Sequence, residues 1–131
     1  MTKPSPNPTE GELAILRVLW SRSEPMTVRE VHAVLTLGKS TAYTTVLKML
    51  TIMADKGLVQ RDESARSHTY RPTQAETTVQ ASLLRDLMKR AFSGSAVTLM
   101  QRALDDQIAS PDDLLAISRL IAQAKAKQKD G

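Results

Sequence analysis

The sequence predicts a mainly α-helical protein that carries one short β-hairpin. Aromatic residues make up only 3% of the 131 residues, and the apolar residues are mostly Leu, Val, Ala, Ile and Met, which favours helix-on-helix packing over a β-sandwich. Apolar residues recur at three- and four-residue spacing in several segments, whereas strand patterns occur only between residues 58 and 72. With 41% hydrophobic content, the chain can form one domain, or a small domain with an appendage.

The composition excludes several classes of function. The chain has no cysteine, which excludes disulfides, thiolate zinc sites, thiol catalysis and cysteine-based copper sensing. No apolar run approaches the ~18 residues of a membrane span, and the first residues lack the apolar run of a secretory signal, so we expect a soluble cytoplasmic protein without membrane insertion. No nucleophile, base and orienting group can be assembled, and no Gly-rich phosphate loop is present. We therefore expect neither an enzyme nor a cofactor.

The N-terminal residues predict an arm followed by a helix. Residues 1–8 are rich in proline and should form a disordered arm. Thr9-Glu-Gly-Glu12 has the Thr-x-x-Glu pattern of a capping box, which begins a helix that runs to about Ser21. Apolar spacing turns Leu16 and its neighbours inward and leaves Glu12 outside, and Trp20 should belong to the core.

The next two helices are predicted to form a helix-turn-helix. A second capping box, Thr27-Val-Arg-Glu30, opens a short helix that ends at Leu37-Gly38-Lys39. Ser40 then begins a helix that runs to about Ala54. Only a few residues around a glycine therefore join the two helices, as the helix-turn-helix unit requires.

The helix that begins at Ser40 has one apolar and one hydroxyl-rich face. The apolar face comprises Val46, Leu47, Leu50, Met53 and Ala54. No carboxylate occurs between Ser40 and Ala54, and short hydroxyl groups can bond phosphates or base edges beside the positive helix N-terminus. We therefore predict that Thr44, Thr45 and Lys48 face the major groove of double-stranded DNA, and that Ser40, Thr41 and Tyr43 contact its backbone or minor groove. Tyr43 has an equal alternative, which is to stabilise the turn before the helix.

Residues 58–72 predict the hairpin. Gly57 suits a left-handed helix stop, and alternation places Leu58 or Val59 and Tyr70 against the helices. Arg61, Arg66, His68 and Arg71 should then be exposed or lie near the tip of the hairpin, and the three arginines are permanent cations. Such charges either grip DNA or only solubilise an edge strand. The neighbouring hydroxyl-rich helix favours a DNA-binding wing, with Arg66 as its main contact and His68 beside it. Residues 1–72 also hold ten Lys and Arg against seven Asp and Glu.

Residues 73–131 predict three amphipathic helices. A third capping box, Thr73-Gln-Ala-Glu76, begins the first, Ser95 caps the second, and Ser110-Pro111 begins the third. Three such helices cannot bury their apolar faces alone, so they either fold back on the winged helix or pair with a second chain, and the wide apolar faces favour pairing. The expected dimerisation residues are Leu83, Leu84, Leu87, Met88, Leu99, Met100, Leu114, Ile117, Leu120 and Ile121. We expect the tail, residues 125–129, to be solvated and frayed.

Six short motifs occur in order along the chain: Glu12-Leu13, Leu16-Arg-Val-Leu-Trp20, Thr27-Val-Arg-Glu-Val-His32, Thr41-Ala-Tyr-Thr-Thr-Val-Leu47, Lys56-Gly-Leu-Val59 and Tyr70-Arg-Pro72. Together they resemble the penicillinase-repressor family over about residues 9–72. The resemblance implies a winged-helix DNA-binding domain at 9–72 and a helical dimerisation domain at 73–131. It also implies a homodimeric repressor that occupies an operator with two-fold symmetry.

The chain departs from this family at three places. Antibiotic-responsive members are cut at an Asn-Phe bond during induction, and Arg102-Ala103 aligns there, so the resemblance does not imply this cleavage or identify an upstream sensor or protease. The cysteine cluster of the copper-responsive branch is absent. Ile52 and Asp55 replace common basic residues, which leaves Lys56 as the cation at that end of the helix.

Two alternatives to the DNA-binding repressor remain open at this point. One is a winged helix that contacts another protein, and the other is a repressor that senses a small ligand directly. The two histidines, His32 and His68, lie on different elements and have no cysteine partner, so we assign no metal site.

Overall fold

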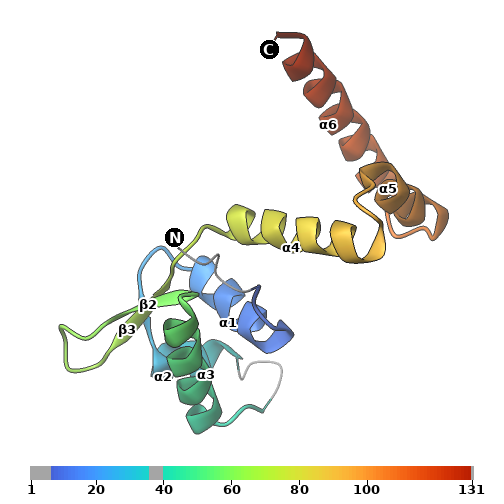
Figure 1. Ribbon diagram of the computed structural model, residues 1–131. Helices are drawn as coiled ribbons and strands as arrows, with labels where there is room; N and C mark the ends of the chain where they lie inside the picture. Colours follow the sequence, from blue (N-terminus) through green and yellow to red (C-terminus); the bar gives the residue numbers. More distant parts are fainter. Residues whose placement is uncertain (1–6, 36–39, 131) are drawn as a thin grey trace. The chain divides into compact units, whose positions relative to one another are not determined.

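The computed structural model describes residues 7–35 and 40–130. The chain divides into two compact units, the first ending at Leu84 and the second beginning at Arg85. The structure confirms the predicted fold class, a mainly helical chain with a winged helix-turn-helix and a small hairpin. The elements follow in the order α1 (Glu10–Trp20), β1 (Met26–Thr27), α2 (Val28–Leu35), α3 (Tyr43–Lys56), β2 (Val59–Asp62), β3 (Thr69–Pro72), α4 (Glu76–Ala91), α5 (Ala96–Asp105) and α6 (Pro111–Asp130) (Figure 1).

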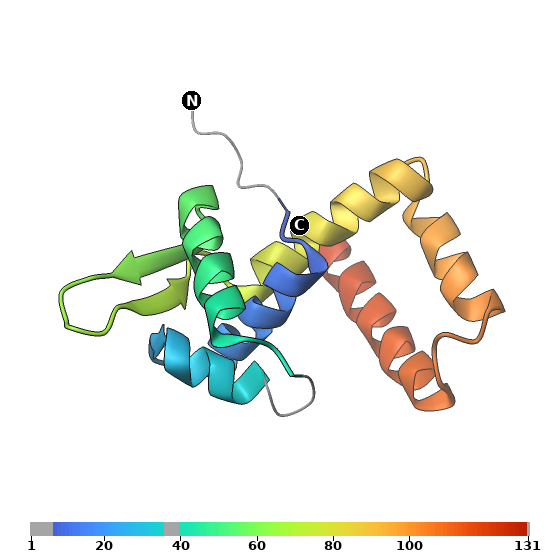
Figure 2. The same ribbon diagram turned by 90° about the horizontal axis from the view of Figure 1, so that it is seen from below.

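A three-stranded antiparallel sheet with the strand order β1-β3-β2 lies beside helices α1 to α3. In the hairpin, Val59 pairs with Pro72 and Asp62 pairs with Thr69, so residues 63–68 form the tip. Both views show this hairpin extending beyond the three helices (Figures 1 and 2). Strand β1 was not expected from the sequence, because two residues are too few to show an alternating pattern.

The core of the first unit joins α1, α2, α3 and the sheet. Tyr70 of β3 is only 2% exposed and packs among the apolar side chains of the helices, as predicted. The buried apolar residues of this core are Ile15, Leu16, Val18, Leu19, Met26, Val28, Val31, Val46, Leu50, Met53, Leu58, Val59 and Tyr70. Trp20 packs against this core, and its indole Nε1 donates to the Gln74 carbonyl at 3.0 Å. The core therefore fixes which face of α3 remains outside.

Local hydrogen bonds begin α1 and α2 as the sequence predicts. The Glu12 N–H donates to Thr9 Oγ1 at 3.2 Å, and the Thr9 N–H donates to Glu12 Oε1 at 2.9 Å. The same reciprocal pair joins Thr27 and Glu30, at 3.2 and 2.9 Å. Both capping boxes are confirmed.

Two helix starts differ from the sequence-based expectation. Helix α3 begins at Tyr43 with Ala42 at its N-cap, so Ser40 precedes the helix. Ala42 is the N-cap because its carbonyl accepts the first backbone hydrogen bonds of the helix, from the N–H groups of residues 45 and 46. The third capping box is also wrong, because α4 begins at Glu76, three residues after Thr73. The predicted end of the preceding helix at 37–39 lies outside the described residues.

The second unit contains α5, α6 and the end of α4. Ser95 and Ser110 accept hydrogen bonds from the N–H groups of Thr98 and Asp113, both at 3.1 Å, which confirms these two caps. Helix α6 continues through the predicted frayed tail to Asp130, since this segment holds no proline or glycine. No helix within residues 7–35 or 40–130 is long and apolar enough to cross a membrane.

Apolar side chains of α5 and α6 remain uncovered in the single chain. No described side chain of α5 is buried, and none of α6 between residues 111 and 129 is buried. Among the expected dimerisation residues, Leu120 is 61% exposed, and Leu83, Met88, Leu99, Met100 and Ile117 are half-buried. The large apolar side chains exposed along α4 to α6 are Leu84, Leu87, Val97, Leu104, Ile108, Leu114, Leu115, Leu120 and Ile121.

Candidate nucleic-acid interface

The exposed face of α3 presents short hydroxyl groups and one cation. Val46, Leu50 and Met53 are fully buried on the opposite face and fix the rotation of the helix. Thr44, Thr45 and Lys48 are all exposed, as the sequence predicts. Because none of the residues from Tyr43 to Ala54 is acidic, the face offers donors and positive charge to a polyanion.

Helix α2 positions the chain at the start of α3. His32 Nε2 lies 2.7 Å from the Thr41 carbonyl oxygen, and the His32 ring meets the Tyr43 ring edge-on at 5.7 Å between centroids. Tyr43 is nevertheless 44% exposed, so it stabilises this turn and still presents part of its ring to solvent. Ala42 supplies no side-chain cap to α3. The first N–H groups of α3 therefore have no side-chain acceptor from the cap residue.

The arginines of the hairpin differ in their partners. Arg61 Nε forms an ion pair with Glu63 at 2.9 Å, and Arg71 Nε donates to Gln60 Oε1 at 2.9 Å. Arg66, at the tip, is exposed and forms no ion pair with any residue in the ranges 7–35 and 40–130. Of the three arginines, Arg66 is therefore the one whose charge is best placed to meet a phosphate.

An open depression of about 540 Å³ lies between the hairpin and the N-terminal half of α3. The structure brings together here three residues that the sequence analysis selected, Tyr43, Arg66 and His68, and two that it did not, Arg29 and Leu47. The full lining is Thr27, Val28, Arg29, Tyr43, Leu47, Arg66, Ser67, His68 and Tyr70. Arg29 was missed because helical spacing alone does not show that the first turn of α2 faces the hairpin.

Leu47 corrects the apolar face that was predicted for α3. It was placed with the buried residues, but it is 41% exposed. The reason is geometric: Val46 and Leu50 point into the core, and Leu47 lies about 100° around the helix from Val46, at the edge of the buried stripe. A large apolar side chain therefore faces outward beside Thr44 and Lys48.

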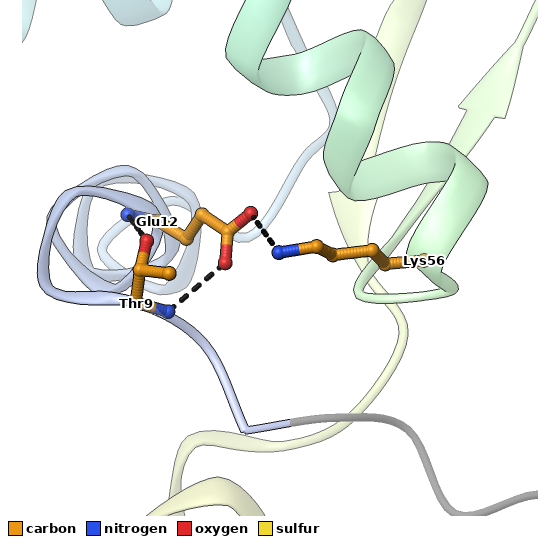
Figure 3. Close-up of polar contacts among 3 residues, drawn as sticks. All are labelled: Thr9, Glu12 and Lys56. Carbon is orange, nitrogen blue, oxygen red and sulfur yellow. Dashed lines mark hydrogen bonds and ion pairs between the residues drawn. The ribbon is translucent and has the colours of Figure 1, made fainter.

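Glu12 and Lys56 also correct the sequence analysis (Figure 3). Glu12 was expected outside, but it is 5% exposed and its Oε2 lies 2.8 Å from Lys56 Nζ. Burial raises the pKa of the Glu12 carboxyl, but the bonds from Lys56 and Thr9 outweigh burial and hold this pKa below its ordinary value. Lys56 was expected to be the cation for DNA at the end of α3, but its charge is held by this internal pair. Its partner lies 44 residues away in the sequence, so no local pattern revealed the pair.

Within the described parts of the chain, no three His, Cys, Asp or Glu side chains gather as ligands for a metal ion. Hydroxyl groups on α3, cations at the hairpin and an apolar residue between them can contact phosphates, base edges and base methyl groups.

Comparisons with known proteins identify the family of the chain. The model of the penicillinase repressor family matches residues 8–123. The transcriptional regulator BlaI of Mycobacterium tuberculosis, in strains CDC 1551 and H37Rv, is 34% identical over 116 residues, which is 88% of this chain and 83% of BlaI. These two findings extend the resemblance beyond the winged helix into the C-terminal helices.

Solved structures show the same fold. The solution structure of the DNA-binding domain of the repressor BlaI is 25% identical, with a TM-score of 0.50, and the match covers 58% of this chain and 92% of that domain. A complex structure of hsRosR-S4 is 20% identical and has a TM-score of 0.54, with 95% of both chains covered, which is a likeness of fold alone. The chain therefore belongs to the penicillinase repressor family, whose members are transcriptional regulators and not enzymes.

Proposed function

We propose that this chain is a homodimeric transcriptional repressor that occupies a dyad-symmetric operator. In this proposal α3 lies in the major groove and the β2–β3 hairpin contacts the backbone or the minor groove. The observation that carries it is the exposed face of α3, which has no carboxylate from Tyr43 to Ala54, beside a hairpin whose tip arginine has no ion pair among the described residues. A repressor that acts on promoter DNA works in the cytoplasm, so the proposal also places the protein there.

The proposed roles follow from position on this surface. Thr44, Thr45 and Lys48 lie along the outer face of α3, where base edges are within reach of an inserted helix. Arg66 and His68 are exposed on the hairpin, where Arg66 would neutralise a phosphate and His68 would contact the DNA beside it. Ser40, Thr41 and Tyr43 flank the start of α3 and would contact the backbone there. Thr41 is half-buried and would use only its exposed atoms.

Self-association is supported by the second unit. Helices α5 and α6 contain large apolar side chains, such as Val97 at 74% and Leu115 at 63% exposure, which a soluble protein normally covers. A second copy of the chain supplies the matching apolar faces, and its winged helix reads the other half of a symmetric site. Two linked half-sites multiply their affinities, which a single small module needs for genomic specificity.

The test is selection of genomic fragments by the purified protein, followed by titration of the best fragment at several salt concentrations. We expect a dyad-symmetric site. The logarithm of the binding constant should fall linearly with the logarithm of the salt concentration, and the steepness of this line should decrease by about 0.9 for each phosphate contact removed. Lys48→Ala and Arg66→Ala should each cost about 1 to 3 kcal/mol of binding. Arg17→Ala, which removes an exposed cation from α1, serves as the matched control and should change binding little. Failure to recover any sequence above background from folded protein would favour a winged helix that contacts another protein.

A further inference from the structure

We propose that Leu47 reads thymine in the operator by packing against its 5-methyl group, and that each half-site therefore contains a thymine that Leu47 contacts. The proposal rests on the proposed DNA-binding function and adds a specificity-determining residue to it. The starting observation is that Leu47 is 41% exposed on α3, beside the exposed Thr44 and Lys48.

The position of Leu47 distinguishes it from an apolar residue that is exposed singly on the surface. It lines the depression between α3 and the hairpin, together with Tyr43 one helical turn before it. Tyr43 is held against His32 by the edge-on ring contact, so the two apolar surfaces lie in a defined place. On the next turn, Thr51 donates its hydroxyl to the Leu47 carbonyl at 2.9 Å, which occupies that donor within the helix.

Charges around this apolar surface favour DNA as the occupant. Arg29, Arg66 and His68 line the same depression and can contact the phosphates on either side of a base. The lining includes no carboxylate. An apolar protein surface would leave these cations without a partner of opposite charge.

Among the base edges of the major groove, thymine is the one that presents a methyl group. Leu47 has no hydrogen-bonding side-chain atom, so the edges of the other bases would leave their polar groups unpaired against it. Removing the methyl from each contacted thymine should weaken binding about fourfold per half-site, because burying one methylene-sized group stabilises by roughly 0.8 kcal/mol. Substitution in both half-sites should then weaken binding about fifteenfold.

Ile52 provides a matched control on the same helix. It is 39% exposed, close to the value for Leu47, but it does not line the depression. Leu47→Ala and Ile52→Ala therefore remove similar exposed apolar side chains, one inside and one outside the proposed contact. Neither side chain is buried in the core, so both variants should fold.

The experiment compares the selected operator with the same fragment in which deoxyuridine replaces thymidine, first throughout and then one position at a time. We expect the wild type and Ile52→Ala to prefer the thymine fragment about fifteenfold, and Leu47→Ala to bind both fragments almost equally. Equal binding of the two fragments by the wild type overturns the inference while leaving operator binding intact, as does an unchanged preference in Leu47→Ala. Failure of all three proteins to bind any selected fragment rejects the proposed function instead.

Discussion

Replacing Glu12 by Gln should test the buried link between the start of α1 and the end of α3. Gln keeps the size of the side chain and one acceptor oxygen. It can therefore still accept the hydrogen bond from the Thr9 N–H, which is 2.9 Å long in the wild type. It cannot form the ion pair with Lys56, whose Nζ lies 2.8 Å from the carboxylate. The substitution therefore isolates the charge from the capping bond (Figure 3).

The magnitude follows from the burial of the two partners. Removing one partner of a fully buried ion pair costs about 3 to 5 kcal/mol, whereas exposed pairs contribute about 0.2 to 1 kcal/mol. The Glu12 side chain is 6% exposed and that of Lys56 is 34% exposed, so water can solvate the ammonium that remains. We expect a loss of about 2 kcal/mol in the free energy of unfolding, or about 8 °C in Tm at roughly 4 °C per kcal/mol.

The same charge gives the stability a pH dependence. The folded-state pKa of Glu12 lies below the ordinary value of 4.5, so the ionised carboxylate favours the folded state. This contribution is complete above pH 4.5 and is lost as the pH falls through the lowered folded-state pKa. The difference between wild type and Glu12→Gln should therefore shrink as the pH falls below this range.

The assay is urea denaturation of the full chain at neutral pH and at several acidic pH values, with unfolding monitored by circular dichroism. Glu30→Gln is the control, because Glu30 forms the same capping box with Thr27 but is exposed and holds no lysine. It should lose less than about 1 kcal/mol. Equal losses in the two variants, or a loss in Glu12→Gln that persists unchanged in acid, would refute the reasoning.

Three further predictions concern other parts of the chain. Gly57 ends α3 at a φ of 84°, so Gly57→Ala should cost about 1 to 2 kcal/mol in urea denaturation, and unchanged stability would contradict the strain argument. Ser110→Ala removes the acceptor of the Asp113 N–H, so it should destabilise α6 and cost about 1 kcal/mol in thermal denaturation. Leu120→Glu places a charge at a side chain that is 61% exposed in one chain, and it should shift the protein toward monomer in analytical ultracentrifugation. An unchanged sedimentation coefficient would remove Leu120 from the proposed interface.

Local signals in the sequence predicted much of the fold. The capping boxes at Thr9 and Thr27 and the Ser95 and Ser110 caps are formed as expected, because both partners of each bond lie within one helical turn. Gly57 takes the left-handed conformation that a helix stop requires. The family was also evident from short motifs, and the comparisons confirm it. The residues proposed to contact DNA and to form the dimer remain predictions.

The sequence by itself determined the elements and the side chains available on each face, since helical periodicity and capping depend on neighbours a few residues apart. Only the tertiary structure decided that Glu12 is buried against Lys56, that Leu47 is exposed and that β1 pairs with β3. It also decided that Arg29 joins Arg66 beside α3. The physical reason is that burial, exposure and pairing depend on which distant element covers a residue, and that information is not contained in any local spacing.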